Sequence, residues 1–206
     1  MKSSKLFITG ADANTKWMLP WFESNFRKHM PDARLMVYDF DEFNPVSGLK
    51  NWFKKPFAMQ AASKLSDSVC WIDSDIEIRE NVEDIFTLCE PNRLAMVEDA
   101  PWTIRRKETW HNSGVVCFCG KPNILDMWAA AVLPLPDNLP PMYGDQDVLH
   151  AIVRTDMKRR IHITDLPRAY NTLRLDLIDN TAPPKIKMMH WTGAKGKEKI
   201  REQMNG

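Results

Sequence analysis

The sequence predicts an α/β protein in which a mostly parallel sheet is flanked by helices. Short apolar runs of strand length alternate along the chain with segments whose apolar residues recur at helical spacing. Polar clusters follow several of the apolar runs, as expected where strands end at a ligand-binding edge. The content of 44% hydrophobic and 27% charged residues is ordinary for a globular protein. At 206 residues, a single domain over residues 1–206 is the default expectation.

The first half of the chain alternates strand and helix signals. An apolar strand is expected at 5–9, a helix at about 15–28 and a second strand at 34–38. Another helix follows Pro56, which is a good first-turn residue, and a fully apolar strand occupies 69–72.

The second half continues the alternation with a proline-rich interruption. Strands are expected at 94–98 and 114–118, and a helix at about 123–132. A loop with four prolines, 134–141, is too short to link independent domains. The remaining expected elements are a helix that starts near Asp145 and late strands at 161–166 and 187–189.

Charge and cysteine usage narrow the class of protein. A net charge of +1 gives no global electrostatic argument for nucleic acid or for an anionic membrane. The apolar run before Gly10 is too short for a signal-peptide core, and no run approaches the roughly 18 residues of a membrane span. The four cysteines lack zinc-like spacing, so reduced thiols in a cytoplasmic protein are expected.

Two carboxylates stand where the strand at 69–72 ends. Asp73 and Asp75 follow this apolar run one residue apart, with Ser74 between them, and alternation resumes at 76–78. Carboxylates at such a place face water, a cation or a phosphate, because burying them unpaired is costly. Their oxygens suit Mg²⁺ or Mn²⁺, which complete their shells with phosphates and water. A turn rich in Asp and Ser explains this segment alone equally well.

A polar cluster follows the first expected strand. Gly10 permits close approach of the backbone to a ligand, and Asp12 and Asn14 offer an acceptor and an amide to a base or ribose. The alternative is that Asp12 or Asn14 only caps the following helix.

Two more clusters lie later in the chain. Asn112 and Ser113 immediately precede the strand at 114–118 and could hydrogen-bond sugar hydroxyls, although an ordinary turn would look the same. Asp145, Gln146 and Asp147 open a helix, and an N-cap role for Asp145 leaves the other two unexplained.

The C-terminal segment offers a histidine and lysines. His190 ends an apolar strand and could be a third metal ligand, whereas a lone histidine is more often structural. Gly193, Lys195 and Lys197 follow in a loop whose charges could offset a diphosphate. Together with the two aspartates, these groups are what a site for a metal-bound diphosphate requires.

The motifs together resemble a known family. Residues 9–14, Lys55-Pro56, the segment 71–75, Asn112-Ser-Gly, Asp145-Gln-Asp and His190-Trp-Thr-Gly occur in the order found in nucleotide-sugar glycosyltransferases of the GT-A fold. The similarity is greatest to family 8, which includes glycogenin and bacterial galactosyltransferases. This resemblance implies a single Rossmann-like domain with a mostly parallel sheet.

The resemblance also implies roles for individual residues. Asp73 and Asp75 match the DxD motif, and His190 matches the third Mn²⁺ ligand. Asp145 matches the residue that binds the transferred sugar, and Gln146 the residue near the anomeric carbon.

Further residues match the donor-binding positions of the family. Lys55 stands near the place of a basic donor-binding residue, with Lys54 as an equal claimant, and Asn112 matches a sugar-contacting asparagine. The remaining implied donor contacts are Thr9, Gly10, Asp12, Asn14, Ser74, Gly193, Lys195 and Lys197.

The chain departs from the family at two positions. The lysine expected six residues after His190 is replaced by Gly196, with Lys195 and Lys197 on either side. The aromatic residue common after Asn14 is replaced by Thr15, which weakens the expectation of base stacking there.

The predicted function is therefore transfer of a sugar from a UDP-sugar to an acceptor hydroxyl, with Mn²⁺ or Mg²⁺ and with retention of configuration. A saccharide acceptor is favoured. One alternative is a phage-type enzyme that glycosylates a hydroxymethylated DNA base, for which Trp102, Arg105, Arg106 and Trp110 offer a basic and aromatic segment. Another is a non-catalytic module that binds a nucleotide sugar.

Overall fold

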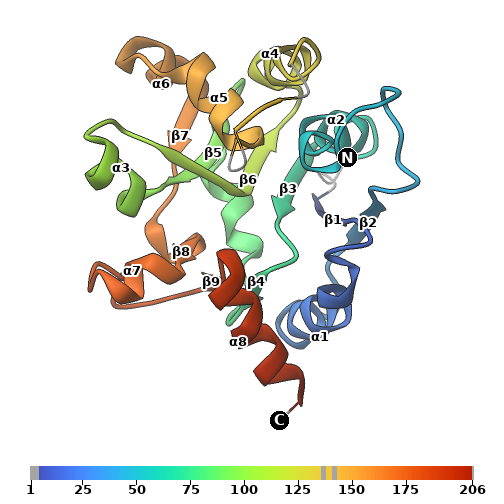
Figure 1. Ribbon diagram of the computed structural model, residues 1–206, viewed down its shortest axis with the longest axis vertical. Coiled ribbons are helices and arrows are strands. Elements are labelled where there is room, and N and C mark those ends of the chain that lie inside the picture. The colour runs from blue at the N-terminus through green and yellow to red at the C-terminus, as the bar shows by residue number, and fades with distance from the viewer. Residues whose placement is uncertain (1–4, 136–137, 141–142, 206) are drawn as a thin grey trace.

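The computed structural model describes residues 5–135, 138–140 and 143–205. In chain order the elements are β1 (Lys5–Ala11), η1 (Lys16–Met18), α1 (Leu19–His29), β2 (Leu35–Asp39), η2 (Asn51–Phe53), α2 (Lys55–Ala62), β3 (Ser68–Ile72), β4 (Ile76–Ile78), η3 (Glu83–Leu88), β5 (Leu94–Glu98), α3 (Ala100–Arg106), β6 (His111–Cys119), α4 (Asn123–Ala131), α5 (Asp145–Val153), α6 (Asp156–His162), β7 (Ile163–Asp165), η4 (Arg168–Tyr170), β8 (Thr172–Leu173), α7 (Arg174–Ile178), β9 (Met188–His190) and α8 (Gly193–Asn205). Figure 1 shows their arrangement. Among the described residues, no helix is long and apolar enough to cross a membrane.

The central sheet is mostly parallel, as the sequence predicts. Within the described ranges it has six strands in the order β2-β1-β3-β6-β5-β7. The pairs β1 with β2, β1 with β3 and β5 with β7 are parallel, whereas β6 is antiparallel to both of its neighbours. Because only β6 runs the other way, its first residues lie at the edge where the other strands end.

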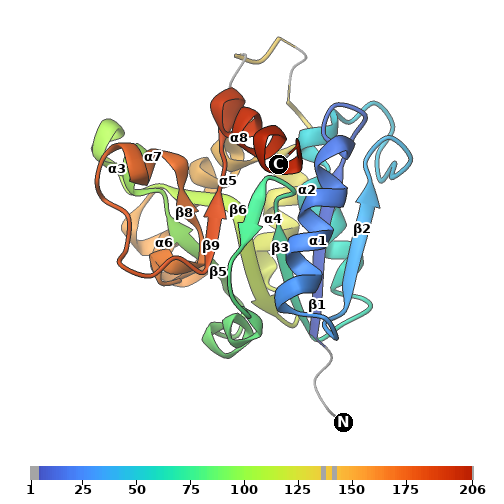
Figure 2. The ribbon, with the colours of Figure 1, turned by 90° about the horizontal axis from the view of Figure 1, so that it is seen from below.

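The two faces of this sheet carry separate hydrophobic cores, since successive side chains of a strand point to opposite faces. Phe7, Cys70 and Ile72 pack with residues of α1, η3 and β9 on one face. Leu6, Val69, Trp71 and Phe118 pack with residues of α2, α4 and α5 on the other. Figure 2 shows α1 on one side of β1 and β3, with α2 and α4 on the other.

A second, smaller sheet adjoins the first. It contains β4, β9 and β8 in that order, with β4 antiparallel and β8 parallel to β9. Ile76 of β4 and Leu173 of β8 both pair with His190. The segment 73–75 therefore connects β3 of the large sheet with β4 of the small one, and His190 ends the strand beside it.

Most expected elements are present, and the differences in the described residues are local. Gly193, Lys195 and Lys197, expected in a loop, lie in the first turns of helix α8 instead. Strand β6 begins at His111, so Asn112 and Ser113 lie within the strand and not in a turn before it.

The helix expected at 15–28 is divided, with 3-10 turns at η1 before α1 begins at Leu19. The strand expected at 161–166 is wrong in its first part, because Ile161 and His162 end helix α6. Thr155 caps the start of that helix, because its Oγ1 accepts a hydrogen bond from Lys158 N at 3.3 Å. This cap favours a helix over the strand that the alternating apolar pattern predicts.

Other features fall outside the predictions. Helices α3 and α7 were not expected, and positions 136–137 and 141 of the proline-rich loop lie outside the described residues. The cysteines are free thiols, and Cys89 Sγ lies 3.1 Å from Cys117 Sγ.

Candidate functional site

The chemistry-bearing residues gather at one edge of the central sheet. Asp12, Asp73 and Asp99 each follow the last residue of a parallel strand, and Asn112 lies in the first residues of the antiparallel β6. Helix α5 begins at the same place with Asp145. The residues therefore lie where open α/β sheets bind their ligands, at the carboxyl ends of the parallel strands.

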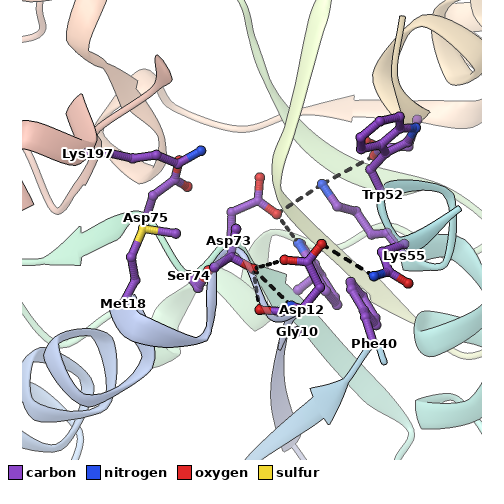
Figure 3. Close-up of a pocket in the computed structure, with 14 residues that line it drawn as sticks. Gly10, Asp12, Met18, Phe40, Trp52, Lys55, Asp73, Ser74, Asp75 and Lys197 are labelled. Atoms are coloured by element: carbon purple, nitrogen blue, oxygen red, sulfur yellow. Dashed lines mark hydrogen bonds and ion pairs between the residues drawn. The ribbon is translucent and has the colours of Figure 1, made fainter. Parts of the chain in front are cut away.

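Two adjoining cavities open at this edge. The smaller has a volume of about 290 Å³, and its lining includes Gly10, Asp12, Trp52, Ser74, Asp75 and Lys197. Figure 3 shows these side chains around the cavity. The larger has a volume of about 480 Å³, and its lining includes Trp102, Arg106, Trp110, Asn112, Tyr143, Gln146 and His190. Lys55, Asp73 and Asp145 line both cavities and so mark their junction.

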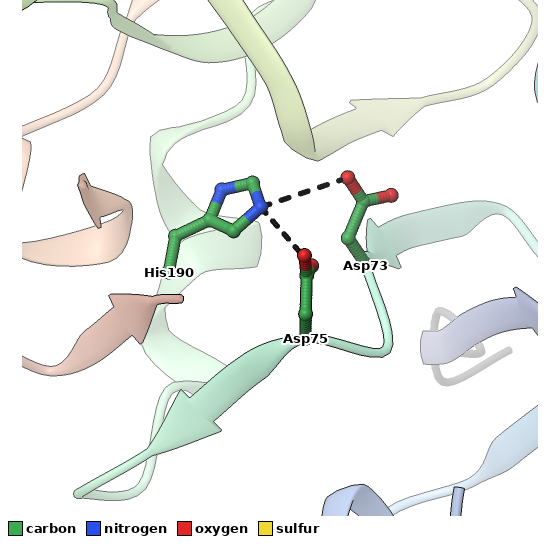
Figure 4. Close-up of side chains that lie close together, drawn as sticks. All are labelled: Asp73, Asp75 and His190. Carbon is green, nitrogen blue, oxygen red and sulfur yellow. Dashed lines mark ion pairs between the residues drawn. The ribbon is translucent and has the colours of Figure 1, made fainter. Parts of the chain in front are cut away.

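Asp73, Asp75 and His190 form a compact cluster (Figure 4). One potential ligand atom from each lies within 4.8 Å of the others. His190 Nε2 is 3.1 Å from Asp75 Oδ1 and 3.9 Å from Asp73 Oδ2. Burial lowers the pKa of His190, but the Asp75 carboxylate outweighs it, so the pKa lies above its usual range. Burial raises the pKa of Asp75, yet His190 and Lys197 hold it below its usual range.

The cluster fits a divalent cation. Two carboxylates and an imidazole nitrogen are ligands that Mn²⁺ accepts, and they leave other positions of its shell for phosphate oxygens. Room for the ring comes from Gly114, where an ideal Cβ would lie 2.3 Å from His190 Cε1. Any other residue at 114 would displace the histidine.

Asp73 presents its two oxygens differently. Asp73 Oδ1 accepts a hydrogen bond from Trp71 Nε1 at 2.6 Å and lies 3.0 Å from Lys55 Nζ. Asp73 Oδ2 is the oxygen that faces His190. Since Oδ1 is already satisfied by the protein, Oδ2 is the oxygen available to a cation.

Backbone hydrogen bonds fix the turn between the two sheets. Asp73 N donates to Gly114 O at 2.8 Å, and Trp191 N donates to Asp75 O at 3.0 Å. The first bond ties the turn to β6 and the second ties it to the residue after β9. Both carboxylates are therefore held by the sheets themselves.

Lys55 is buried at the junction of the cavities. Its Nζ lies 3.0 Å from Asp73 Oδ1 and 3.2 Å from Asp145 Oδ2, and it donates to Ser113 O at 3.0 Å. Burial lowers the pKa of Lys55, but Asp145 and Asp73 outweigh it and raise the pKa above its usual range. Lys54, the other claimant, instead donates from Nζ to Phe40 O at 2.5 Å. The structure thus places Lys55 in the site and Lys54 beside it.

Gln146 and Asn112 are held by a buried carboxylate, Asp99. Asn112 Nδ2 donates to Asp99 Oδ2 at 3.2 Å, and Gln146 Nε2 donates to the same oxygen at 3.4 Å. Gln146 Oε1 accepts from Ser113 N and from Asn112 Nδ2, each at 3.1 Å. Burial raises the pKa of Asp99. The Gln146 amide is therefore fixed in orientation.

Asp145 is the first residue of α5, while the helix is capped elsewhere. Gly144 is the N-cap, and Gly144 N donates to Asp147 Oδ2 at 2.9 Å. The alternative N-cap role for Asp145 is therefore wrong, and Asp147 is explained by capping. Burial raises the pKa of Asp145 despite the nearby Lys55.

The nucleotide-side residues are tightly packed. An ideal Cβ at Gly10 would lie 2.5 Å from Phe40 Cζ, so any larger residue would force the Phe40 ring to move. Asp12 Oδ1 accepts from Thr15 Oγ1 at 2.8 Å and from Asn14 N at 3.1 Å. Thr15 thus supports Asp12 in place of the aromatic residue expected at its position.

Some predicted residues lie away from the cavities. Thr9 is buried, and its hydroxyl has no partner among the described residues. Asn14, Gly193 and Lys195 are exposed and line neither cavity. Lys197 does line the smaller cavity, beside Asp75 (Figure 3).

Several residues of the site are not predicted by the sequence. Asp99 follows β5 at the ligand edge, so the rule that found Asp73 could have found it. Asn171, which contacts both Asn112 and His190, carries no comparable signal because it lies in an irregular segment. Trp52, which is 55% exposed at the smaller cavity, was also missed.

Comparisons with known proteins identify the fold. A scan for known protein families finds no match to this sequence. A search of curated proteins finds none either. Solved structures, in contrast, match almost the whole chain. A glycosyltransferase involved in glycosylation of the major capsid of PBCV-1 is 14% identical with a TM-score of 0.67, and the match covers 98% of this chain and 100% of that one.

Two further structures agree. The galactosyltransferase LgtC, solved in complex with donor and acceptor sugar analogs, is 13% identical with a TM-score of 0.63 and coverage of 97% and 95%. GlyE from Streptococcus pneumoniae TIGR4 is 15% identical with a TM-score of 0.63, and the match covers 93% of this chain and 55% of that one. The chain therefore has the GT-A fold, as its motifs predict.

Proposed function

We propose that this GT-A domain, residues 1–206, is a metal-dependent glycosyltransferase that moves a sugar from a UDP-sugar to an acceptor hydroxyl with retention of configuration. The observation that carries the proposal is the junction of the two cavities. A carboxylate–histidine cluster adjoins it on one side, and Lys55 and Asp145 stand at its centre. A donor that spans the junction would place its diphosphate beside the cluster and its sugar beside Asp145.

The smaller cavity suits the nucleotide part of the donor. Gly10 lines this cavity after β1, and Asp12 supplies acceptor oxygens for ribose hydroxyls. The exposed indole of Trp52 offers a face on which a base can stack. Lys197 would meet the diphosphate, with Ser74 at the same wall.

Mn²⁺ or Mg²⁺ bound by Asp73, Asp75 and His190 would supply positive charge for the leaving diphosphate. The protein's own cations add to this effect. Lys55 lies beside Asp73 and Lys197 beside Asp75 (Figure 3), so both would offset charge that grows on the phosphate oxygens.

The larger cavity suits the transferred sugar and the acceptor. Asn112 and Gln146 line it together with Asp145, and several aromatic side chains line it as well. Among the described residues, Asp99 Oδ2 is the one acceptor for Gln146 Nε2, so the second N–H of this amide remains available to a substrate. Trp102, Trp110 and Tyr143 offer apolar faces to a pyranose ring, which favours a saccharide acceptor.

Retention follows if the acceptor attacks from the face that the diphosphate leaves. The acceptor O–H bond and the bond from the anomeric carbon to the phosphate oxygen break, and a new bond from the anomeric carbon to the acceptor oxygen forms. The acceptor proton departs with UDP on the leaving phosphate. Asp145 and Gln146 would orient the sugar during this exchange.

The test is UDP release from a panel of UDP-sugars, with Mn²⁺ and with EDTA, followed by NMR of the product's anomeric configuration. Release that needs the metal, and a product with the donor's configuration, supports the proposal. UDP-sugar binding without any release across donors and saccharide acceptors would instead favour a non-catalytic binding module.

A further inference from the structure

Two buried asparagines connect the start of β6 with the histidine of the cluster. Asn112 Oδ1 accepts a hydrogen bond from Asn171 Nδ2 at 2.8 Å, and Asn171 Oδ1 lies 3.1 Å from His190 Nδ1. Asn171 is 1% exposed and precedes β8, which pairs with the strand of His190.

Backbone N–H groups determine which atom of each side-chain amide is the oxygen and which is the nitrogen. Gly114 N can only donate, and it lies 2.9 Å from the Asn112 atom that is therefore the carbonyl oxygen. Ser113 N can only donate as well, and it fixes Gln146 Oε1 as an acceptor. The Asn112 group that faces Gln146 Oε1 must then be its amide nitrogen. Two independent contacts thus give the same orientation of Asn112.

The orientation of Asn112 determines that of Asn171 and of the histidine. Because Asn112 presents a carbonyl oxygen, Asn171 must face it with its NH₂ group. The oxygen of Asn171 then faces His190 Nδ1, which must carry a proton to make a favourable contact. An imidazole that keeps its proton on Nδ1 can give the lone pair of Nε2 to a cation. Nε2 is the nitrogen that faces the two aspartates.

The ring has little freedom to adopt another arrangement. An ideal Cβ at Gly114 would lie 2.3 Å from His190 Cε1 and 2.6 Å from Nδ1, so this edge of the ring lies against the glycine. Within the described part of the chain, Asn171 is the one side chain in hydrogen-bond contact with Nδ1.

We propose that Asn171 is a positioning residue that holds the proton of His190 on Nδ1 and thereby delivers Nε2 to a divalent cation. We call the hydrogen-bonded series Gly114 N, Asn112, Asn171 and His190 the relay. The backbone N–H of Gly114 sets the direction of its hydrogen bonds, because it fixes the orientation of Asn112 and therefore that of Asn171. The inference rests on the proposed function, because it presupposes that the cluster takes a cation.

The first experiment measures Mn²⁺ affinity by isothermal titration calorimetry. Asn171→Leu keeps similar volume but removes both hydrogen bonds, and the Kd should rise roughly 10- to 100-fold. The matched control is Thr172→Val, which removes the neighbouring, partly buried hydrogen bond from Thr172 Oγ1 to Arg168 O and leaves the contacts of Asn171 intact. Its Kd should stay within about twofold of the wild type.

The outcomes separate the two proposals. If the wild-type protein does not bind Mn²⁺, both the proposed metal site and the proposed role of Asn171 are contradicted. If the wild type binds Mn²⁺ and Asn171→Leu binds as tightly as Thr172→Val, the relay alone is overturned.

The second experiment needs no variant, so it holds even if Asn171→Leu does not fold. In the Zn²⁺-loaded wild-type protein, the ¹⁵N NMR shifts of His190 should show a proton on Nδ1 and none on Nε2. Zn²⁺ is a diamagnetic stand-in that imidazole binds readily. A proton on Nε2, with Nδ1 unprotonated, would overturn the inference.

Discussion

Gly196 packs directly on the backbone of Trp191. An ideal Cβ at Gly196 would lie 2.0 Å from Trp191 O, so no larger residue fits at this point of α8. The helix therefore lies tightly against the residue that follows His190. A lysine six residues after the histidine is excluded by this contact, and the next residue, Lys197, lines the smaller cavity instead. The departure from the family pattern thus has a steric cause.

We predict that Lys197→Ala weakens UDP binding. Loss of a charge-assisted contact to the diphosphate costs about 1.5–3 kcal/mol, which corresponds to roughly 10- to 150-fold in Kd. Calorimetric titration with UDP and Mn²⁺ measures it. Lys195→Ala is the matched control, since Lys195 is exposed and lines neither cavity. Equal losses in the two variants would mean that the role of Lys197 is only general charge.

We predict that Asp75→Asn lowers turnover by orders of magnitude while the fold persists. The substitution removes a charge from the cation's shell without changing volume, so Mn²⁺ affinity should fall in parallel. UDP release and Mn²⁺ titration measure the two effects, with circular dichroism as the check on folding. Glu80→Gln serves as control, because Glu80 pairs with Lys185 on the surface. Full activity of Asp75→Asn, or of the wild type in EDTA, would contradict the proposal that a metal ion bound at this site is needed for activity.

We predict opposite pH trends for stability and for metal binding. The pKa of His190 is raised above its ordinary 6.5 in the folded state. Its charge therefore stabilises the metal-free protein fully below pH 6.5, and this contribution is lost as pH rises through the folded pKa. Mn²⁺ requires an unprotonated Nε2, so its affinity rises over the same interval.

The measurements are urea unfolding in EDTA and Mn²⁺ titration between about pH 6 and 8. His190→Gln should lose both trends, whereas His29→Gln should keep them because His29 ends helix α1 and is not part of the cluster. Unchanged pH profiles in His190→Gln would show that another group titrates.

We predict that Trp102→Ala raises the KM for a saccharide acceptor several-fold and leaves UDP affinity unchanged. Trp102 lines the larger cavity only, and an aromatic contact contributes about 0.5–1.5 kcal/mol. Trp102→Phe, which keeps an aromatic face, is the control. A KM for UDP-sugar that rises equally would place Trp102 on the donor side.

The same cavity tests the DNA alternative. Arg105 is paired with Asp179 at 2.8 Å, whereas Arg106 lies over the Trp102 ring at 4.9 Å and lines the cavity. We expect no salt-dependent DNA binding by the wild type. If DNA binds, replacing Arg105, Arg106 and Lys107 by Ala should flatten the salt dependence by roughly one unit of slope per lost phosphate contact, and the acceptor would be nucleic acid.

The order of apolar runs and polar clusters was sufficient to predict the sheet and its ligand edge. Strand periodicity is local, and a carboxylate that follows a buried strand must emerge at the sheet's end, so Asp73 and Asp75 could be found from sequence. Asp145 was found from a different signal, the Asp-Gln-Asp cluster that opens helix α5. The sequence predicts a strand for the last residues of helix α6 because a short alternation of apolar and polar residues fits both states, and the structure shows the helix that Thr155 caps.

Contacts between segments that are distant in the sequence were determined only by the tertiary structure. Pairing of β9 with β4 and β8 brings His190 to Asp75 and Asn171, and no local pattern encodes that approach. That Lys197 lines the smaller cavity and Lys195 does not likewise depends on how helix α8 packs against the end of β9. Sequence determines which groups stand at strand ends, because periodicity fixes burial. Which of them meet depends on the packing of separate elements, which periodicity does not specify.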